Sequence, residues 1–214
     1  MPRATPFCRG GIVDFVPIKP LTIHTKTKIS LPKHVTQQEE HSLHWYAFKV
    51  FFNKVFEIDR NIRERKVETY FPVIKTYKLS GDHHRLVQRP AISSLIFVRC
   101  SETVVWEIQQ QLYGRVMLFT HKTDGAKVAS PIDEEEMRLF RLVTSVEDER
   151  LQYLDVESVN YKEGQRVRVL DGPYKDCVGY IKRIKGNRRL LVAVEGLALV
   201  ATSYIPSVFL EKIN

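Results

Sequence analysis

A short turn between two β-type runs constrains this chain more than any other feature. The run Asp171–Gly179 contains Gly172-Pro173, a strong turn signal. Gly179 indicates a backbone that bends or lies close to another strand. Tyr174 is an unusual residue for a plain solvated loop. The flanking runs with strand character are Arg166–Leu170 and Tyr180–Lys185. The C-terminal part of the chain is therefore predicted to be a small all-β unit.

The composition fits a chain with two small domains that works with an acidic partner. Its 214 residues carry a formal net charge of +8, which favours nucleic acid or a nucleic-acid machine as partner. The cysteines, Cys8, Cys100 and Cys177, are widely spaced, so we predict neither a disulfide framework nor a zinc site. This cysteine usage fits a protein of the reducing cytoplasm. No apolar run approaches the length of a membrane span, and no signal peptide is expected.

Charge and pattern divide the chain into four parts. Residues 1–43 are rich in proline and basic, and we expect a mostly disordered extension there. Residues 44–146 alternate strand and helix patterns. Residues 147–160 hold five acidic side chains and one arginine, which is typical of a solvated linker. Residues 161–214 are basic, and the Val-rich pattern of Leu190–Thr202 predicts a β-barrel.

The pattern of residues 44–146 predicts the order β-α-β-β-α-β-α. In the first strand, Trp45 and Ala47 point to one face, and Tyr46 and Phe48 to the other. The first helix is expected to begin after Asn53 as its N-cap. The expected strands are His44–Phe52, Val67–Leu79, Ala91–Cys100 and Val116–Phe119, and the expected helices run to about Lys66, over Glu102–Leu112, and onward from Ser130-Pro131.

Both halves resemble the NusG family of transcription factors. The run Gly164–Ile184 resembles a KOW motif, and residues 44–146 resemble the NGN domain. The matching NGN motifs are Trp45-Tyr46, Phe71-Pro72 and Ser130-Pro131-Ile132-Asp133. The run from Ala201 to Ile213 is most similar to the specialised UpxY-type paralogs, which are encoded with long polysaccharide operons. The resemblance implies an α+β NGN domain, with an antiparallel four-stranded sheet and flanking helices, followed by an SH3-like KOW barrel.

The resemblance also implies a surface that grips the clamp helices of RNA polymerase. Carried over by position, this surface uses Tyr46, Phe71, Ile92 and Leu95. The chain departs from the family at Ala91–Leu95, where many members have Phe-Pro-Gly-Tyr, so the shape of the grip differs. Ordinary sheet core is the alternative interpretation of all four residues.

A polar stretch beside that surface is expected to be a basic hairpin that contacts DNA or nascent RNA near the transcription bubble. Its candidate phosphate-binding residues are Lys75, Lys78, Arg85 and Arg89. A plain solvated hairpin is the alternative. His83-His84 has no Cys or carboxylate partners in the pattern, so no metal is predicted.

The turn of the KOW domain, with Gly172, Pro173 and Tyr174, matches the place where NusG factors engage a ribosomal protein or a termination factor. Arg188-Arg189 is expected on a second hairpin, where it contacts RNA or only keeps an edge soluble.

No enzyme motif is present, and we predict neither catalysis nor a cofactor. The acidic run Asp133–Glu136 fits the start of a helix, because consecutive helical residues point in different directions. The expected function is antitermination on a specific long operon through RNA polymerase, in the cytoplasm. The alternatives are a housekeeping NusG and, from another class, a KOW protein that binds the ribosome or rRNA.

Overall fold

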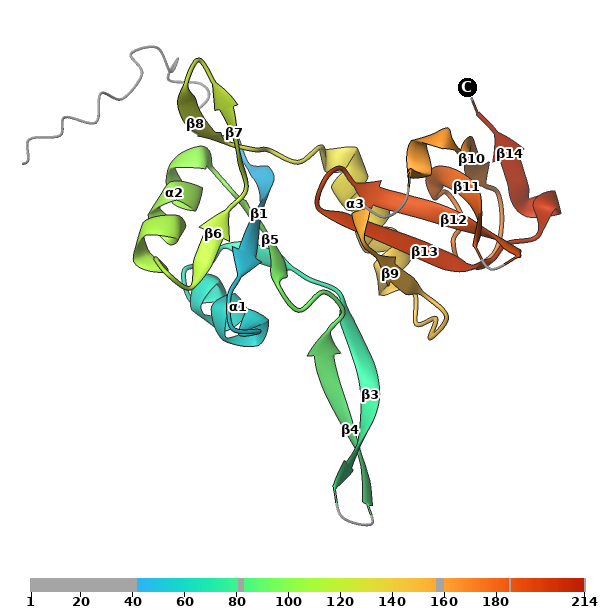
Figure 1. The fold of residues 1–214 in the computed structure, drawn as a ribbon, viewed down its shortest axis with the longest axis horizontal. Coiled ribbons are helices and arrows are strands. Elements are labelled where there is room, and N and C mark those ends of the chain that lie inside the picture. The colour runs from blue at the N-terminus through green and yellow to red at the C-terminus, as the bar shows by residue number, and fades with distance from the viewer. Residues whose placement is uncertain (1–41, 81–82, 157–159, 185, 214) are drawn as a thin grey trace, which may run out of the picture. The chain divides into compact units, whose positions relative to one another are not determined.

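The structure is a computed structural model that describes residues 42–80, 83–156, 160–184 and 186–213 (Figure 1). The extension expected over residues 1–43 lies almost wholly outside the described residues. The N-terminal elements are β1 (His44–Val50), α1 (Val55–Arg63), β2 (Glu68–Tyr70), β3 (Val73–Ser80), β4 (His83–Pro90), β5 (Leu95–Cys100), α2 (Glu102–Gln111), β6 (Val116–Leu118), β7 (Thr120–Thr123), β8 (Ala126–Ala129) and α3 (Glu134–Ser145).

The N-terminal part is built on a four-stranded antiparallel sheet of order β2-β5-β1-β6. Strand β1 lies between β5 and β6, and an apolar core covers each of its two faces. Trp45 and Ala47 enter one core, and Tyr46 and Phe48 enter the other. The α+β class predicted from the sequence is confirmed.

Helices α1 and α2 supply the apolar side chains that cover one face of this sheet. Val55, Ile58 and Ile62 of α1 are buried against it, at the spacing of one helical stripe. The expected N-cap is wrong by one residue: Lys54 is the N-cap and makes no side-chain capping bond. Asn53 instead adopts a positive φ of 53°, so it ends the preceding turn and does not cap the helix.

Two hairpins extend the sheet region. Strands β3 and β4 form a two-stranded ribbon that projects from the end of β2 and β5 (Figure 1). Strands β7 and β8 form the second hairpin, which we did not predict. Its signal was present as Asp124-Gly125, both with positive φ, the residue pair that two-residue hairpin turns favour.

The C-terminal part is a six-stranded antiparallel sheet of order β14-β10-β11-β12-β13-β9, so the predicted all-β region is confirmed. Its strands and 3₁₀ turns are β9 (Gln152–Leu154), η3 (Tyr161–Glu163), β10 (Gln165–Val169), β11 (Val178–Ile184), β12 (Asn187–Val194), β13 (Ala198–Tyr204), η4 (Ser207–Phe209) and β14 (Leu210–Lys212). Strand β9 belongs to the segment expected to be a solvated linker. It joins the sheet because Leu151 and Tyr153 bring apolar surface to the core. The linker prediction rested on the acidic residues of this segment and did not weigh these two apolar side chains.

Helix α3 carries apolar side chains on two sides. At about 100° per residue, Met137, Phe140 and Thr144 share one side, and Leu139, Leu142 and Val146 share the opposite one. Phe140 meets Phe97 of β5 edge-on, with ring centroids 5.6 Å apart. The helix also lies against β12 and β13 (Figure 1), and one continuous apolar core joins both sheets through it. A helix buried on two sides can hold two sheets together.

Candidate functional site

Three of the four basic residues predicted for nucleic-acid binding share one face of the β3–β4 hairpin. Lys78 pairs directly with Arg85 across the ribbon. Arg89, four residues after Arg85 and opposite Ile74, lies on the same face. Like charges directly opposite in a sheet destabilise it, and all three side chains are exposed. Within the described residues, none of the three makes an ion pair. This face is therefore suited to bind an anion.

Lys75, the fourth predicted residue, lies on the other face of the hairpin. Its Nζ donates a hydrogen bond of 2.6 Å to Glu147 Oε1. That bond and the charge of Glu147 raise the pKa of Lys75. The same bond and the charge of Lys75 lower the pKa of Glu147. Lys75 is thus already occupied by a carboxylate, which the sequence pattern did not reveal because Glu147 is far along the chain.

The same opposite face exposes apolar side chains. Tyr77 is directly opposite Leu86, and both are largely exposed. His83 and His84 are adjacent in a strand, so they point to opposite faces. Across the described ranges, no group of His, Cys, Asp or Glu is placed to hold a metal ion.

The four residues predicted to bind RNA polymerase do not share one surface. Tyr46 belongs to the core under α1 and α2, and burial raises its pKa to about 12. Phe71 packs at the margin of that core, edge-on to Phe56 with ring centroids 5.4 Å apart. Leu95 is buried in the core on the other side of the sheet, and Ile92 packs at the margin of that second core.

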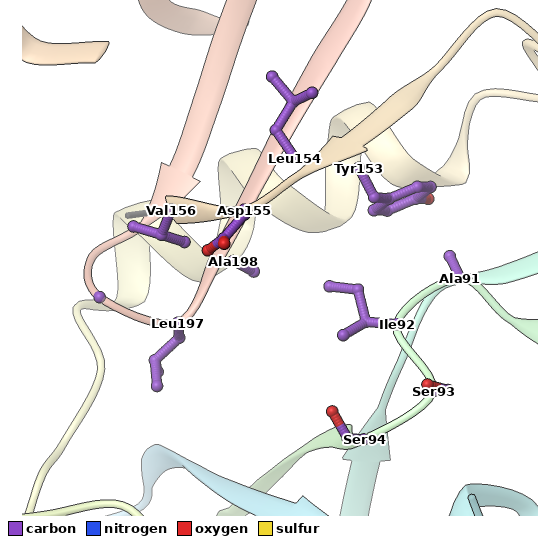
Figure 2. Close-up of a pocket in the computed structure, with 11 residues that line it drawn as sticks. Ala91, Ile92, Ser93, Ser94, Tyr153, Leu154, Asp155, Val156, Leu197 and Ala198 are labelled. Atoms are coloured by element: carbon purple, nitrogen blue, oxygen red, sulfur yellow. The ribbon is translucent and has the colours of Figure 1, made fainter. Parts of the chain in front are cut away.

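Ile92 lines a cavity. The loop from Ala91 to Ser94 faces β9 and the turn before β13 across a cavity of about 410 Å³. Figure 2 shows the Ile92 side chain pointing from its loop into this space, with Tyr153 and Leu197 on other sides. The loop that borders this open cavity is the location where the sequence departs from the NusG pattern, and Ser93, Ser94 and Asp155 add polar groups to its lining.

Tyr174 is buried, with 4% of its surface exposed, although the sequence predicted it at an accessible turn. Its hydroxyl donates a hydrogen bond of 2.8 Å to Asp148 Oδ2, and burial raises its pKa to about 12. Gly172 and Pro173 remain exposed at the tip, and Gly172 has a φ of +89°. In this structure the tip, and not the tyrosine ring, is the accessible part of the turn.

Asp148 is the charged centre of a small network that sequence reasoning missed. Its Oδ1 accepts bonds from the Arg150 backbone N–H at 2.9 Å and the Arg150 guanidinium at 3.0 Å. Burial acts to raise the pKa of Asp148, but hydrogen bonds from Ser203, Arg150 and Tyr174 outweigh it and hold that pKa well below its usual range. Asp148 therefore ties the segment after α3 to the C-terminal sheet.

Arg189, predicted on a hairpin as an RNA contact or a solubilising charge, has a structural role. Its Nη1 donates to the carbonyl oxygens of Arg150 and Thr202, each at 3.4 Å. Arg188 is exposed beside it.

The two thiols of the described chain, Cys100 and Cys177, are free and buried, and burial raises the pKa of each. Neither thiol is therefore an activated nucleophile.

Comparison with known proteins agrees with the resemblance seen in the sequence. Residues 43–141 match the family described as "Transcription termination factor nusG". No curated protein sequence matches the chain. A solved structure titled "Domain interaction in Thermotoga maritima NusG" matches with 18% identity and a TM-score of 0.41, covering 81% of this chain and 98% of that one. No helix in the described ranges is long and apolar enough to span a membrane.

Proposed function

We propose that this chain is a NusG-type transcription factor that binds RNA polymerase through residues 44–146 and suppresses pausing or termination in the cytoplasm. The observation that carries the proposal is the family match of residues 43–141, which runs from β1 into α3. Its mechanism is binding, with no bond made or broken. Action on a specific long polysaccharide-type operon is the finer form of the proposal, supported by the UpxY-like run from Ala201 to Ile213.

Ile92 is our candidate for direct contact with the polymerase. It is half-buried beside an open cavity, whereas Tyr46 and Leu95 are almost fully buried and can only support the sheet. An Ile92→Arg substitution places a charge at this margin without opening either core. Val208→Arg is the matched control, because Val208 is 78% exposed in the C-terminal part.

The decisive experiment measures binding of the full chain to core RNA polymerase and, in parallel, to ribosomal subunits. The proposal expects polymerase binding that Ile92→Arg weakens and Val208→Arg leaves unchanged, together with more read-through at a terminator in vitro. Binding to ribosomal subunits alone would reject it in favour of a ribosome- or rRNA-directed protein. Equal read-through on unrelated templates would favour a housekeeping factor over an operon-specific one.

The basic face of the β3–β4 hairpin is our candidate contact for DNA or RNA near the bubble. Phosphate contacts make binding salt-dependent, and each lost contact lowers the salt slope by about one. Alanine at Lys78, Arg85 or Arg89 should therefore reduce the slope for a short duplex. Lys75→Ala is the matched control, because Glu147 already occupies that ammonium group. An equal decrease of the salt slope in all four variants would show that the two faces do not differ in phosphate binding.

We place the contact with a further protein, such as a ribosomal protein or a termination factor, at the exposed tip of the C-terminal turn. Gly172 and Pro173 are accessible there. Pro173→Ala should weaken the binding of such a partner, whereas Tyr174→Phe should lower the free energy of unfolding.

A further inference from the structure

The β3–β4 hairpin has few connections to the rest of the chain. In the described ranges its two strands pair with each other and with no other strand. At its base, the Ala91 N–H donates to the Pro72 carbonyl oxygen at 2.8 Å. A two-stranded ribbon is marginally stable by itself and has no packed layer to fix its direction. Side chains near its base must therefore set the direction in which the basic face points.

Helix α3 holds the strand that leads into the hairpin. Arg141 Nη1 donates to Glu68 Oε1 of β2 at 3.0 Å, and the Arg141 guanidinium lies 5.2 Å from the centroid of the Tyr70 ring. The Thr144 hydroxyl donates to the Phe140 carbonyl oxygen at 2.6 Å, so the Tyr70 hydroxyl is the donor to Thr144 Oγ1, at 2.5 Å. Glu68 and Tyr70 share one face of β2, and Arg141 and Thr144 are neighbours on the helix surface. The helix therefore binds β2 at two points along its length.

A third contact reaches the hairpin itself. Glu147, which directly follows the C-cap residue of α3, accepts the hydrogen bond from Lys75 of β3. Among the residues that the structure describes, this is the one side-chain hydrogen bond or ion pair that joins the hairpin to another element. Because both side chains are exposed, we expect the pair to shift an equilibrium by about five-fold at most.

The direction of the hairpin matters because two candidate contacts lie on either side of its base. The basic face lies on the hairpin, and Ile92 lies two residues after Pro90, where β4 ends. Two sites on one chain reinforce each other only when the geometry allows both to be engaged at once. The angle between the hairpin and the loop that follows it therefore decides whether DNA and polymerase can be bound together.

We propose that Arg141, Thr144 and Glu147 are positioning residues that fix the direction of the β3–β4 hairpin, so that its basic face meets DNA while the neighbouring loop holds the polymerase. A hairpin that samples other directions is competent for only part of the time, and the apparent affinity falls with that fraction. Lys75 is then an anchor of the hairpin and not a phosphate contact. Only the identity of the two partners rests on the proposed function, because the direction of the hairpin is a property of the free chain.

The first test measures that direction in the free, full-length chain. Spin labels attached through ketone-bearing unnatural residues at His84 and Gln111, both exposed, should give one narrow distance distribution in pulsed electron spin resonance. The test variant replaces all three positioning residues: Arg141→Leu, Thr144→Val and Glu147→Ala. It should broaden the distribution, and Glu147→Ala alone, at an exposed site, should do so if the triple variant does not fold. Glu135→Ala is the matched control, because Glu135 makes an exposed ion pair within α3 itself. An unchanged distribution in the folded variants overturns the proposal.

The second test compares binding to polymerase alone with binding to an assembled polymerase–DNA complex. Lys75→Ala and Glu147→Ala should each weaken binding to the complex about five-fold and leave binding to polymerase alone unchanged. Exchange of the two charges, Lys75→Glu with Glu147→Lys, should restore the wild-type affinity and the narrow distance distribution. A direct phosphate contact by Lys75 requires opposite signs, because Glu147→Ala would then free the ammonium group and strengthen binding, and that result overturns the proposal.

The remaining outcomes separate positioning from stability and from the proposed function. Equal weakening of both complexes, with a lower free energy of unfolding, assigns the contacts of α3 to stability alone and overturns the proposal. If the wild-type chain does not bind polymerase while the variants broaden the distance distribution, the proposed function fails and the positioning role stands.

Discussion

Substitution of Tyr174 by phenylalanine tests whether this side chain stabilises the fold or serves a partner. The change removes only the hydroxyl that donates to Asp148 Oδ2 at 2.8 Å. The ring stays in its core, where 4% of the residue is exposed. A bond to a charged acceptor contributes about 1.5–3 kcal/mol. Because the Asp148 side chain is only 11% exposed, we expect a loss of about 2 kcal/mol in the free energy of unfolding at pH 7.

The pH dependence follows from the lowered pKa of Asp148. A carboxyl group with a depressed folded-state pKa stabilises the protein above its unfolded pKa, about 3.9 for aspartate, and this stability is lost as pH falls below it. From pH 7 to pH 3 the wild-type protein should lose about 1.2 kcal/mol through this group. Asp148→Asn has nothing to titrate, so the gap between it and wild type should narrow by that amount.

The assay is urea unfolding of wild type, both single variants and the double variant at the two pH values. A double-mutant cycle should give a coupling of about 1–2 kcal/mol between Tyr174 and Asp148. Tyr204→Phe, at an exposed site in β13, should change stability by less than about 0.5 kcal/mol. An equally small effect of Tyr174→Phe, with weaker partner binding, would refute the structural assignment and restore the partner-binding one.

Two further substitutions test features of the sheets. Gly179→Ala places a Cβ against the Leu191 carbonyl oxygen and the Leu190 side chain, so β11 and β12 must separate. Thermal unfolding should show a loss of about 2–3 kcal/mol. Gly196→Ala has open space and only the strain of a φ of 69°, which costs about 1 kcal/mol, so equal losses would contradict the close approach. The Gln109 side-chain amide accepts a hydrogen bond from Leu118 N at 2.6 Å and donates one to Val116 O at 3.4 Å, so it covers the outer edge of β6. Gln109→Leu removes both bonds. The freed edge should promote concentration-dependent association in light scattering, whereas Gln111→Leu, exposed on the same helix, should not; a monomeric Gln109→Leu protein would show that the edge is protected in another way.

Local chemistry made much of the fold predictable. The alternation of β1, the apolar stripe of α1 and the acidic first turn of α3 each depend on residues close in sequence, so the elements could be placed without tertiary information. The second hairpin was also predictable in principle, since Asp124-Gly125 specifies its turn. The basic face of β3–β4 followed once the alternation of a strand was applied to its lysines and arginines.

The tertiary structure decided which of those residues are available. Tyr46 and Leu95 fill opposite cores because β1 and β5 are interior strands covered on both faces. Lys75 meets Glu147, and Tyr174 meets Asp148, across 72 and 26 residues of sequence. Periodicity reports the direction of a side chain relative to its neighbours in the chain. Burial and ion pairing depend on what the rest of the chain brings to that side, and this is why the charges and strands were predictable while the accessible site was not.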